Sequence, residues 1–227
     1  MKKLIYLFLL LPIFINAQDL YWLDVMVEIP RENQPTATTL INEYYSSINI
    51  PSDISISFSS IPFKGVDIKA THILSMFSPS AESLANFRAS LGKGDRWNMY
   101  SAGMRGKVKP RGLAGNVLVG MNYDKAGSLG QVWLFKVHAK DRQKFVSAFS
   151  KLMKIIEPKG LIACGQITHG NSNGESMFIY STSESLIEAI SSSPSNKKEA
   201  DAFQTFFDEI SFADLSQSFT RSLIKEF

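Results

Sequence analysis

Hydrophobic and polar residues along the chain follow two periods, one near 2 and one near 3.6, which are typical of strands and helices. In 20–29, the side chains of Trp22, Asp24, Met26 and Glu28 would point to one side of a strand and the residues between them to the other. The same reasoning predicts eight strands, the last of them by analogy with the first half of the chain: 20–29, 54–61, 71–77, 116–123, 131–139, 161–168, 176–181 and 216–223.

Helical periodicity fills the intervals between these strands. The clearest helix follows Asp141 and ends before Pro158 and Gly160, because its apolar residues recur at helical spacing: Phe145, Phe149, Leu152, Met153 and Ile156. Further helices are expected over 36–48, from Ser78 to about Leu91, after a Ser181/Glu184 capping box, and over 203–210. The ranges 92–115 and 212–227 show no decisive period, apart from a short amphipathic pattern at 97–104.

One stretch occurs twice, which indicates a repeated unit. Phe77–Phe87 and Tyr180–Ile190 share an aromatic residue, a serine-rich junction, Glu-Ser-Leu and a helical pattern. Upstream, Trp22 and Trp133 occupy similar tripeptides. Two landmarks in the same order predict an α+β protein made of two ferredoxin-like β-α-β-β-α-β units, at 18–123 and 131–227, with 124–130 as linker.

This arrangement resembles the dimeric α/β-barrel superfamily, in which two ferredoxin-like units pack around a shared cavity. The resemblance implies a pseudo-dimeric barrel within one chain. Members include monooxygenases, haem-degrading enzymes and chlorite dismutase-like enzymes. No catalytic motif of these can be placed on the sequence residue by residue, so the resemblance implies a fold and no particular activity.

The first seventeen residues match a secretory signal peptide. Lys2 and Lys3 precede an apolar run from Leu4 to Ile15, and Ala17 offers a cleavage site. The apolar run is shorter than the roughly 20 residues of a membrane-spanning helix. We therefore expect export, to the periplasm or the exterior of a bacterium, with no membrane span after cleavage.

Charge and cysteine content exclude several partners. Removing Lys2 and Lys3 from the 24 basic side chains leaves 22, against 21 acidic ones, so nothing favours nucleic acid. Cys164 is the only cysteine and lies in an apolar run, which indicates a buried thiol and no internal disulfide. No Cys or His spacing suggests zinc or another metal.

Candidate ligand-binding residues come from the two tryptophan strands. If helices cover the Tyr21 side of 20–29, the opposite side presents Trp22, Asp24, Met26 and Glu28, and aligning the tryptophans places Trp133 and Phe135 across from them. Such a cavity would suit a small, mainly apolar ligand. The alternative is that the carboxylates lie at an exposed strand edge and Trp22 fills the core.

Histidines offer a second possibility. His72 or His138 could ligate haem or act as a general base, although an ordinary structural role is commoner, and His169 is expected in solvent. Alternating Arg105, Lys107, Lys109 and Arg111 could hold an anion or form a solvated strand edge. The sequence thus predicts an exported ligand-binding protein without a resident cofactor, with a monooxygenase-like or haem-handling enzyme and an envelope interaction module as alternatives. The oligomeric state is left open.

Overall fold

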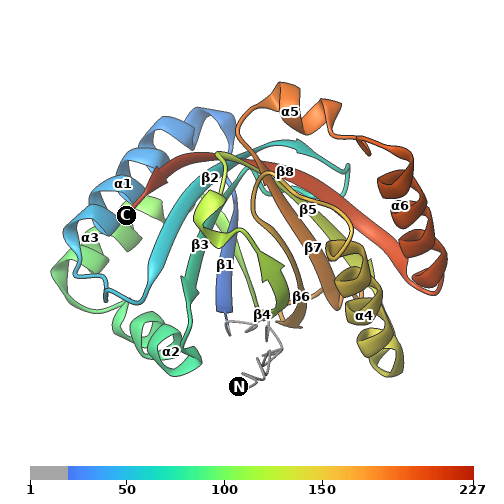
Figure 1. Ribbon diagram of the computed structural model, residues 1–227. Helices are drawn as coiled ribbons and strands as arrows, with labels where there is room; N and C mark the ends of the chain where they lie inside the picture. Colours follow the sequence, from blue (N-terminus) through green and yellow to red (C-terminus); the bar gives the residue numbers. More distant parts are fainter. Residues whose placement is uncertain (1–19) are drawn as a thin grey trace, which may run out of the picture.

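The computed structural model describes residues 20–227, and its eight strands form one closed antiparallel barrel (Figure 1). The predicted signal peptide lies outside the described residues. The strands are β1 (Leu20–Glu28), β2 (Ser55–Lys64), β3 (His72–Ser78), β4 (Lys109–Met121), β5 (Leu129–Lys136), β6 (Ile162–His169), β7 (Met177–Ser183) and β8 (Asp214–Glu226). Around the barrel they follow the order β1-β3-β2-β8-β5-β7-β6-β4, and the last strand pairs with the first.

The helices lie outside the barrel in two groups, α1 to α3 on one flank and α4 to α6 on the other (Figure 1). They are α1 (Gln34–Ser47), α2 (Ala81–Ser90), α3 (Gly94–Met104), α4 (Arg142–Met153), α5 (Leu186–Ser191) and α6 (Lys197–Glu209). Three short 3-10 turns join elements: η1 (Arg31–Asn33), η2 (Tyr123–Lys125) and η3 (Ala139–Asp141). Among residues 20–227, no helix is long and apolar enough to cross a membrane.

The two halves of the chain repeat one order of elements. The first half contributes β4-β1-β3-β2 to the barrel and the second contributes β8-β5-β7-β6. The halves meet at two seams, β2 with β8 and β4 with β6. The expected linker 124–130 is shorter than predicted, because Leu129 and Gly130 already pair with β7 and β8.

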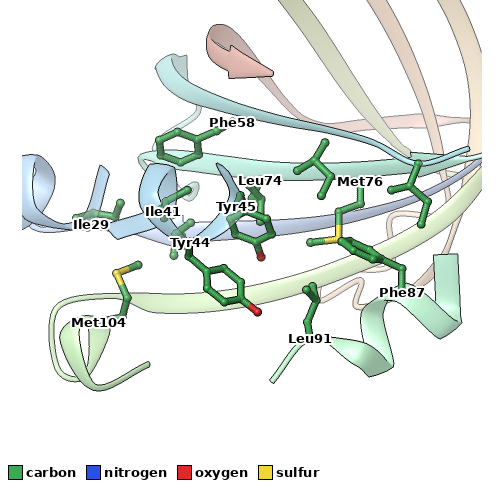
Figure 2. Packing of buried hydrophobic residues seen from close by; sticks show 14 of the residues in the cluster. Ile29, Ile41, Tyr44, Tyr45, Phe58, Leu74, Met76, Phe87, Leu91 and Met104 are labelled. Atoms are coloured by element: carbon green, nitrogen blue, oxygen red, sulfur yellow. The ribbon is translucent and has the colours of Figure 1, made fainter. Parts of the chain in front are cut away.

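Each half buries the outer face of its sheet under its own helices. In the first half, Phe58, Leu74 and Met76 of the sheet pack against Ile41 and Tyr45 of α1, and Leu84 and Phe87 of α2 extend the cluster (Figure 2). In the second half, Phe135 packs against Phe145 of α4, whose ring centre lies 5.1 Å away. Successive residues of a strand face opposite sides of the sheet. The strand residues between those that pack under the helices therefore point into the barrel.

Two helices begin later than predicted, because the strands before them continue past their apolar residues into the serines that follow. β7 continues to Ser183, so Ser181 pairs within the sheet and Ser185 caps α5 by accepting from the Glu188 amide. Glu188 in turn accepts from the amide of Glu184, the residue before the cap, so a pattern similar to a capping box forms four residues later than expected. Likewise Ser78 belongs to β3, and Ser80 caps α2.

Candidate functional site

A cavity of about 450 Å³ lies inside the barrel. Its volume is within the roughly 300–1,000 Å³ range of small-molecule sites. β1 contributes Leu20, Trp22, Asp24 and Met26 to the lining, and each of the seven remaining strands also adds inward-facing residues. Most are apolar, and β2 contributes serines; the lining includes Ser55, Ser57, Ser59, Phe77, Leu113, Val117, Val132, Leu134, Ala163, Ile167, Phe178, Tyr180, Phe219, Arg221 and Leu223.

The cavity is closed at one end and reaches the surface at the other. At the closed end, Met26 and Phe219 pack with Ile61, Ile68 and Ile73 in a buried cluster. At the other end the lining consists of η2 and the residues that follow it, together with Leu161 and the end of β8; exposed Ala126, Ser128 and Glu226 are among them. The cavity therefore meets the solvent at the η2 end.

Three glycines make room for large rings in the barrel wall. A Cβ on Gly130 would lie 2.4 Å from the Tyr180 hydroxyl, and one on Gly165 would lie 2.5 Å from the ring of Phe178. A Cβ on Gly115 would meet Trp22 at 2.8 Å. These aromatic rings can therefore occupy their positions only because the three glycines have no side chain.

Trp22 forms an aromatic wall of the cavity. Its ring packs edge-on against Phe178, with centroids 5.4 Å apart and planes at 88°. The indole is 7% exposed, and its Nε1 is buried without a hydrogen-bond partner in the described chain. Buried donors are nearly always paired in native proteins, so the unpaired N–H of Trp22 is an unusual feature of this wall.

Arg221 on β8 brings a positive charge into the cavity. Its Nε donates to the Tyr180 hydroxyl at 3.0 Å, and its Nη1 donates to the Ser75 hydroxyl at 3.0 Å. The guanidinium carbon lies 4.3 Å from the centre of the Tyr180 ring and 5.9 Å from that of Phe77. Within residues 20–227, no carboxylate forms an ion pair with Arg221.

Asp24 lies beside this group. It is opposite Ser75 in the pairing of β1 with β3. Burial raises the pKa of the Asp24 carboxyl, while the charge of Arg221 and a hydrogen bond from Ser75 act in the opposite direction. Its Oδ1 is enclosed and has no partner among the described residues. Asp24, Tyr180 and Arg221 thus bring polar groups from three strands to the cavity, and Ser75, buried outside the lining, joins Asp24 to Arg221.

The structure brings together three of the predicted ligand-binding residues of β1. Trp22, Asp24 and Met26 line the cavity, as the alternation of the strand suggests. Glu28 is absent from the lining and lies at the end of β1, where its carboxylate is 3.9 Å from the Lys109 ammonium. Whether the three lining residues bind a ligand stays a prediction.

Trp133 and Phe135 lie on the side of the sheet opposite to the one expected. Both pack in the cluster under α4 and α6, and Val132 and Leu134 face the cavity instead. The reason is register. Trp22 pairs with Phe77, whereas Val132, not Trp133, pairs with Tyr180. Aligning the two tryptophans is wrong by one residue, which exchanges the two faces of the strand.

The histidines do not reach the cavity. His72 faces the helices, where it stacks on Phe58 with ring centres 5.3 Å apart. Burial, and to a smaller extent the charge of Lys64, lowers the pKa of its imidazole. His138 and His169 are exposed at the ends of strands.

The cavity therefore does not fit a histidine-ligated haem. His72, His138 and His169 all lie outside the cavity lining, so none of them is placed to hold haem iron there. In residues 20–227, no group of three or more His, Cys, Asp or Glu side chains is placed to bind a metal ion.

Other sequence patterns have structural roles. Lys109 and Arg111 lie on β4, while Arg105 and Lys107 precede it in the turn after α3, so the four do not share one strand. Arg111 donates to the Gly170 carbonyl at 2.9 Å. Lys225 donates to Ser46 of α1 at 2.9 Å, on the outside of the barrel.

Sequence reasoning missed Arg221, Tyr180 and Phe178 as cavity residues, and Ser75 as a partner of Arg221. Tyr180 and Phe77 were noticed only as landmarks of the repeat. Arg221 left a weak signal, because Phe219, Arg221 and Leu223 alternate and only a strand would place them on one face.

Solved structures share this fold, although no protein family and no curated protein matches the sequence. An anthrone oxidase-like protein is 14% identical over 93% of this chain and 94% of its own, with a TM-score of 0.61. A monooxygenase-like protein from Lactobacillus acidophilus NCFM is 12% identical over 92% and 95%, with a TM-score of 0.62.

A chlorite dismutase-like protein is 4% identical over 91% of this chain and 95% of its own, with a TM-score of 0.53. These neighbours belong to the dimeric α/β-barrel superfamily. At such identities the similarity shows the fold alone, an α/β barrel as the sequence predicts, and it carries no activity.

Proposed function

We propose that the protein binds a small, mainly apolar ligand inside the barrel. The observation that carries the proposal is the cavity of about 450 Å³, with apolar and aromatic walls, a closed end and an end at the surface. Burying apolar ligand surface contributes roughly 25 cal/mol per Å², so such walls favour binding of an apolar ring or chain.

Fluorescence of N-phenyl-1-naphthylamine, a neutral apolar reporter, tests this. Titration of the protein should give saturable binding, and Val132→Phe, which adds a ring to the cavity wall, should weaken it at least about tenfold. Lys136→Phe is the matched control, because it adds the same ring on the same strand at an exposed position. Equal affinities for the two variants would contradict binding inside the barrel.

A second candidate is a monooxygenase-like reaction on the bound ligand. The observation that favours it is Asp24, a carboxyl group in the cavity whose pKa is raised by burial, because carboxyl groups with perturbed pKa values in cavities are typical of general acids and bases. The names of the anthrone oxidase-like and monooxygenase-like neighbours supply the chemistry to test.

Anthrone is the substrate for this test. Its oxidation by dioxygen gives anthraquinone and water, which absorbance and mass spectrometry follow in air. An active protein should accelerate the reaction, and Asp24→Asn should lower the rate by about 10²-fold or more if Asp24 is the base. No acceleration by the wild-type protein would reject anthrone oxidation and leave the binding proposal intact.

We also infer two finer points. Residues 1–17 direct export and are then removed, which the basic start and apolar run support; the N-terminal sequence of the protein recovered from outside the cytoplasm tests this. The two halves arose by duplication of one unit, which their common strand order supports. Superposing 20–121 on 129–226, with Trp22 on Val132, should overlay the four strands.

A further inference from the structure

Arg221 is a charged group that forms no ion-pair contact in the described chain, although its charge acts on nearby Asp24. Both of its hydrogen bonds go to neutral hydroxyls, those of Tyr180 and Ser75, and within residues 20–227 it forms no ion pair. Arginine stays protonated in proteins, so half-buried Arg221 keeps its charge at the cavity wall. A charge that is partly removed from water is normally paired with an opposite charge.

Asp24 behaves differently, because a carboxyl group can become neutral. It lines the cavity, its Oδ1 has no partner in the described chain, and Ser75 lies between it and Arg221. A neutral Asp24 would offer an O–H donor to the cavity. Trp22 Nε1, also unpartnered, is a second donor in the same wall.

The rest of the lining adds little charge around this group. Strands β3 and β4, which flank Asp24, place Ser75 and Leu113 opposite it. The other titratable groups of the cavity are Tyr180, which accepts from Arg221, and Tyr123 and Glu226 at the open end. With Asp24 neutral, the interior therefore has a net charge of one positive unit beside a largely apolar space.

We propose that the ligand is an anion, with one carboxylate or similar oxyacid group on an apolar body, and that Arg221 binds this group next to Asp24. The inference rests on the proposed binding of an apolar ligand in the barrel. The hydrogen bond to Tyr180 holds the Arg221 guanidinium in position. A guanidinium forms stronger hydrogen bonds to an oxyanion than to a neutral acceptor. The neutral carboxyl of Asp24 removes the repulsion that a second carboxylate would cause.

The matched probes are 1-naphthoate and 1-naphthamide, which have nearly the same shape and differ in charge. Displacement of N-phenyl-1-naphthylamine from the full-length protein gives both affinities between pH 6 and pH 9. We expect naphthoate to bind about tenfold or more tightly than naphthamide at pH 6. Its affinity should fall as the pH rises, because binding requires a proton on Asp24.

Variants separate the two parts of the inference. Arg221→Gln should remove the preference for naphthoate, and Arg221→Lys, which keeps the charge, should retain part of it. Lys225→Gln, which removes a charge from the outer side of the same strand, should leave the preference unchanged. Asp24→Asn, which fixes a neutral side chain, should bind naphthoate at least as tightly as the wild type, with no loss at high pH.

Three results would overturn the inference. Equal affinities for naphthoate and naphthamide would reject the anion and keep the apolar cavity. Loss of naphthoate binding in Asp24→Asn would reject a protonated Asp24. Absence of binding by the reporter and both probes would reject the proposed function and this inference together. If Arg221→Gln does not fold, the wild type, Arg221→Lys and Asp24→Asn still decide the question.

Discussion

Burial has opposite effects on the pKa of two side chains in the first half of the barrel. It raises the pKa of Asp24 and lowers that of His72, and both changes favour the neutral form. For Asp24, the neutral form leaves Arg221 as the charge of the cavity. For His72, it allows the imidazole to stack on Phe58 among apolar side chains under the helices.

The lowered pKa of His72 predicts a loss of stability in mild acid. The unfolded chain binds a proton at this position below about pH 6.5, and the folded protein does so only at lower pH. The free energy of unfolding should therefore decrease as the pH falls below about 6.5. Urea unfolding midpoints at pH 7.5 and pH 5.5 measure the decrease, which His72→Gln should make smaller.

Exposed His138 supplies the control for that experiment. His138→Gln should lose as much stability between the two pH values as the wild type does. An undiminished loss in His72→Gln would show that another group is responsible. Asp24 acts in the opposite direction, because its raised pKa lets the folded protein keep this proton to higher pH than the unfolded chain does. The wild type and both histidine variants contain Asp24, so the comparison among them isolates the contribution of His72.

Among the elements, α6 has one buried face, which packs against α4. Phe206 is buried, and its ring centre lies 6.3 Å from that of Phe145 and 6.4 Å from that of Phe149, both on α4. The next residue, Phe207, is 57% exposed. Adjacent residues on one helix thus have the same side chain in two environments.

Replacing these phenylalanines separates burial from helix propensity. Phe206→Ala should lower the free energy of unfolding by about 3–5 kcal/mol, because it leaves a cavity between α6 and α4. Phe207→Ala should cost less than about 1 kcal/mol. Urea denaturation followed by circular dichroism measures both, and equal losses would contradict the packing of α6 described above.

At the scale of the molecule, the closed barrel joins the two halves into one sheet. The β4–β6 seam includes Gly115, where a Cβ would lie 1.9 Å from the Gln166 carbonyl oxygen and 2.8 Å from Trp22. Gly112, on the same strand, has nothing within 4 Å of its Cβ position. The seam and the cavity wall therefore depend on the same glycine.

Gly115→Ala should loosen both the seam and the cavity. We expect a loss of about 1–3 kcal/mol in the free energy of unfolding, with weaker binding of N-phenyl-1-naphthylamine. Gly112→Ala should change neither property appreciably. Thermal unfolding and reporter titration of the two variants make the comparison, and an equally stable Gly115→Ala would show that the seam can shift to accept the methyl group.

The sequence by itself determined the kind and order of the elements. Periods of 2 and 3.6 are local properties, so they revealed seven of the eight strands and the long helices. The repeated stretch at Tyr180 suggested the β-α-β-β-α-β order, and the eighth strand followed only by analogy between the halves. The periods also placed Trp22, Asp24 and Met26 on one side of β1. Ends of elements were less well predicted, because Ser78 and Ser181 look like helix caps and yet pair within strands.

Only the tertiary structure decided which faces line the cavity and which charges meet there. A shift of one residue in the pairing of β5 moved Trp133 from the expected cavity to the helix side. Arg221 meets Ser75, which is 146 positions away, because β8 closes the barrel against β2. Side-chain alternation repeats along every strand alike, so the inward face and the partners across the barrel depend on strand register and closure.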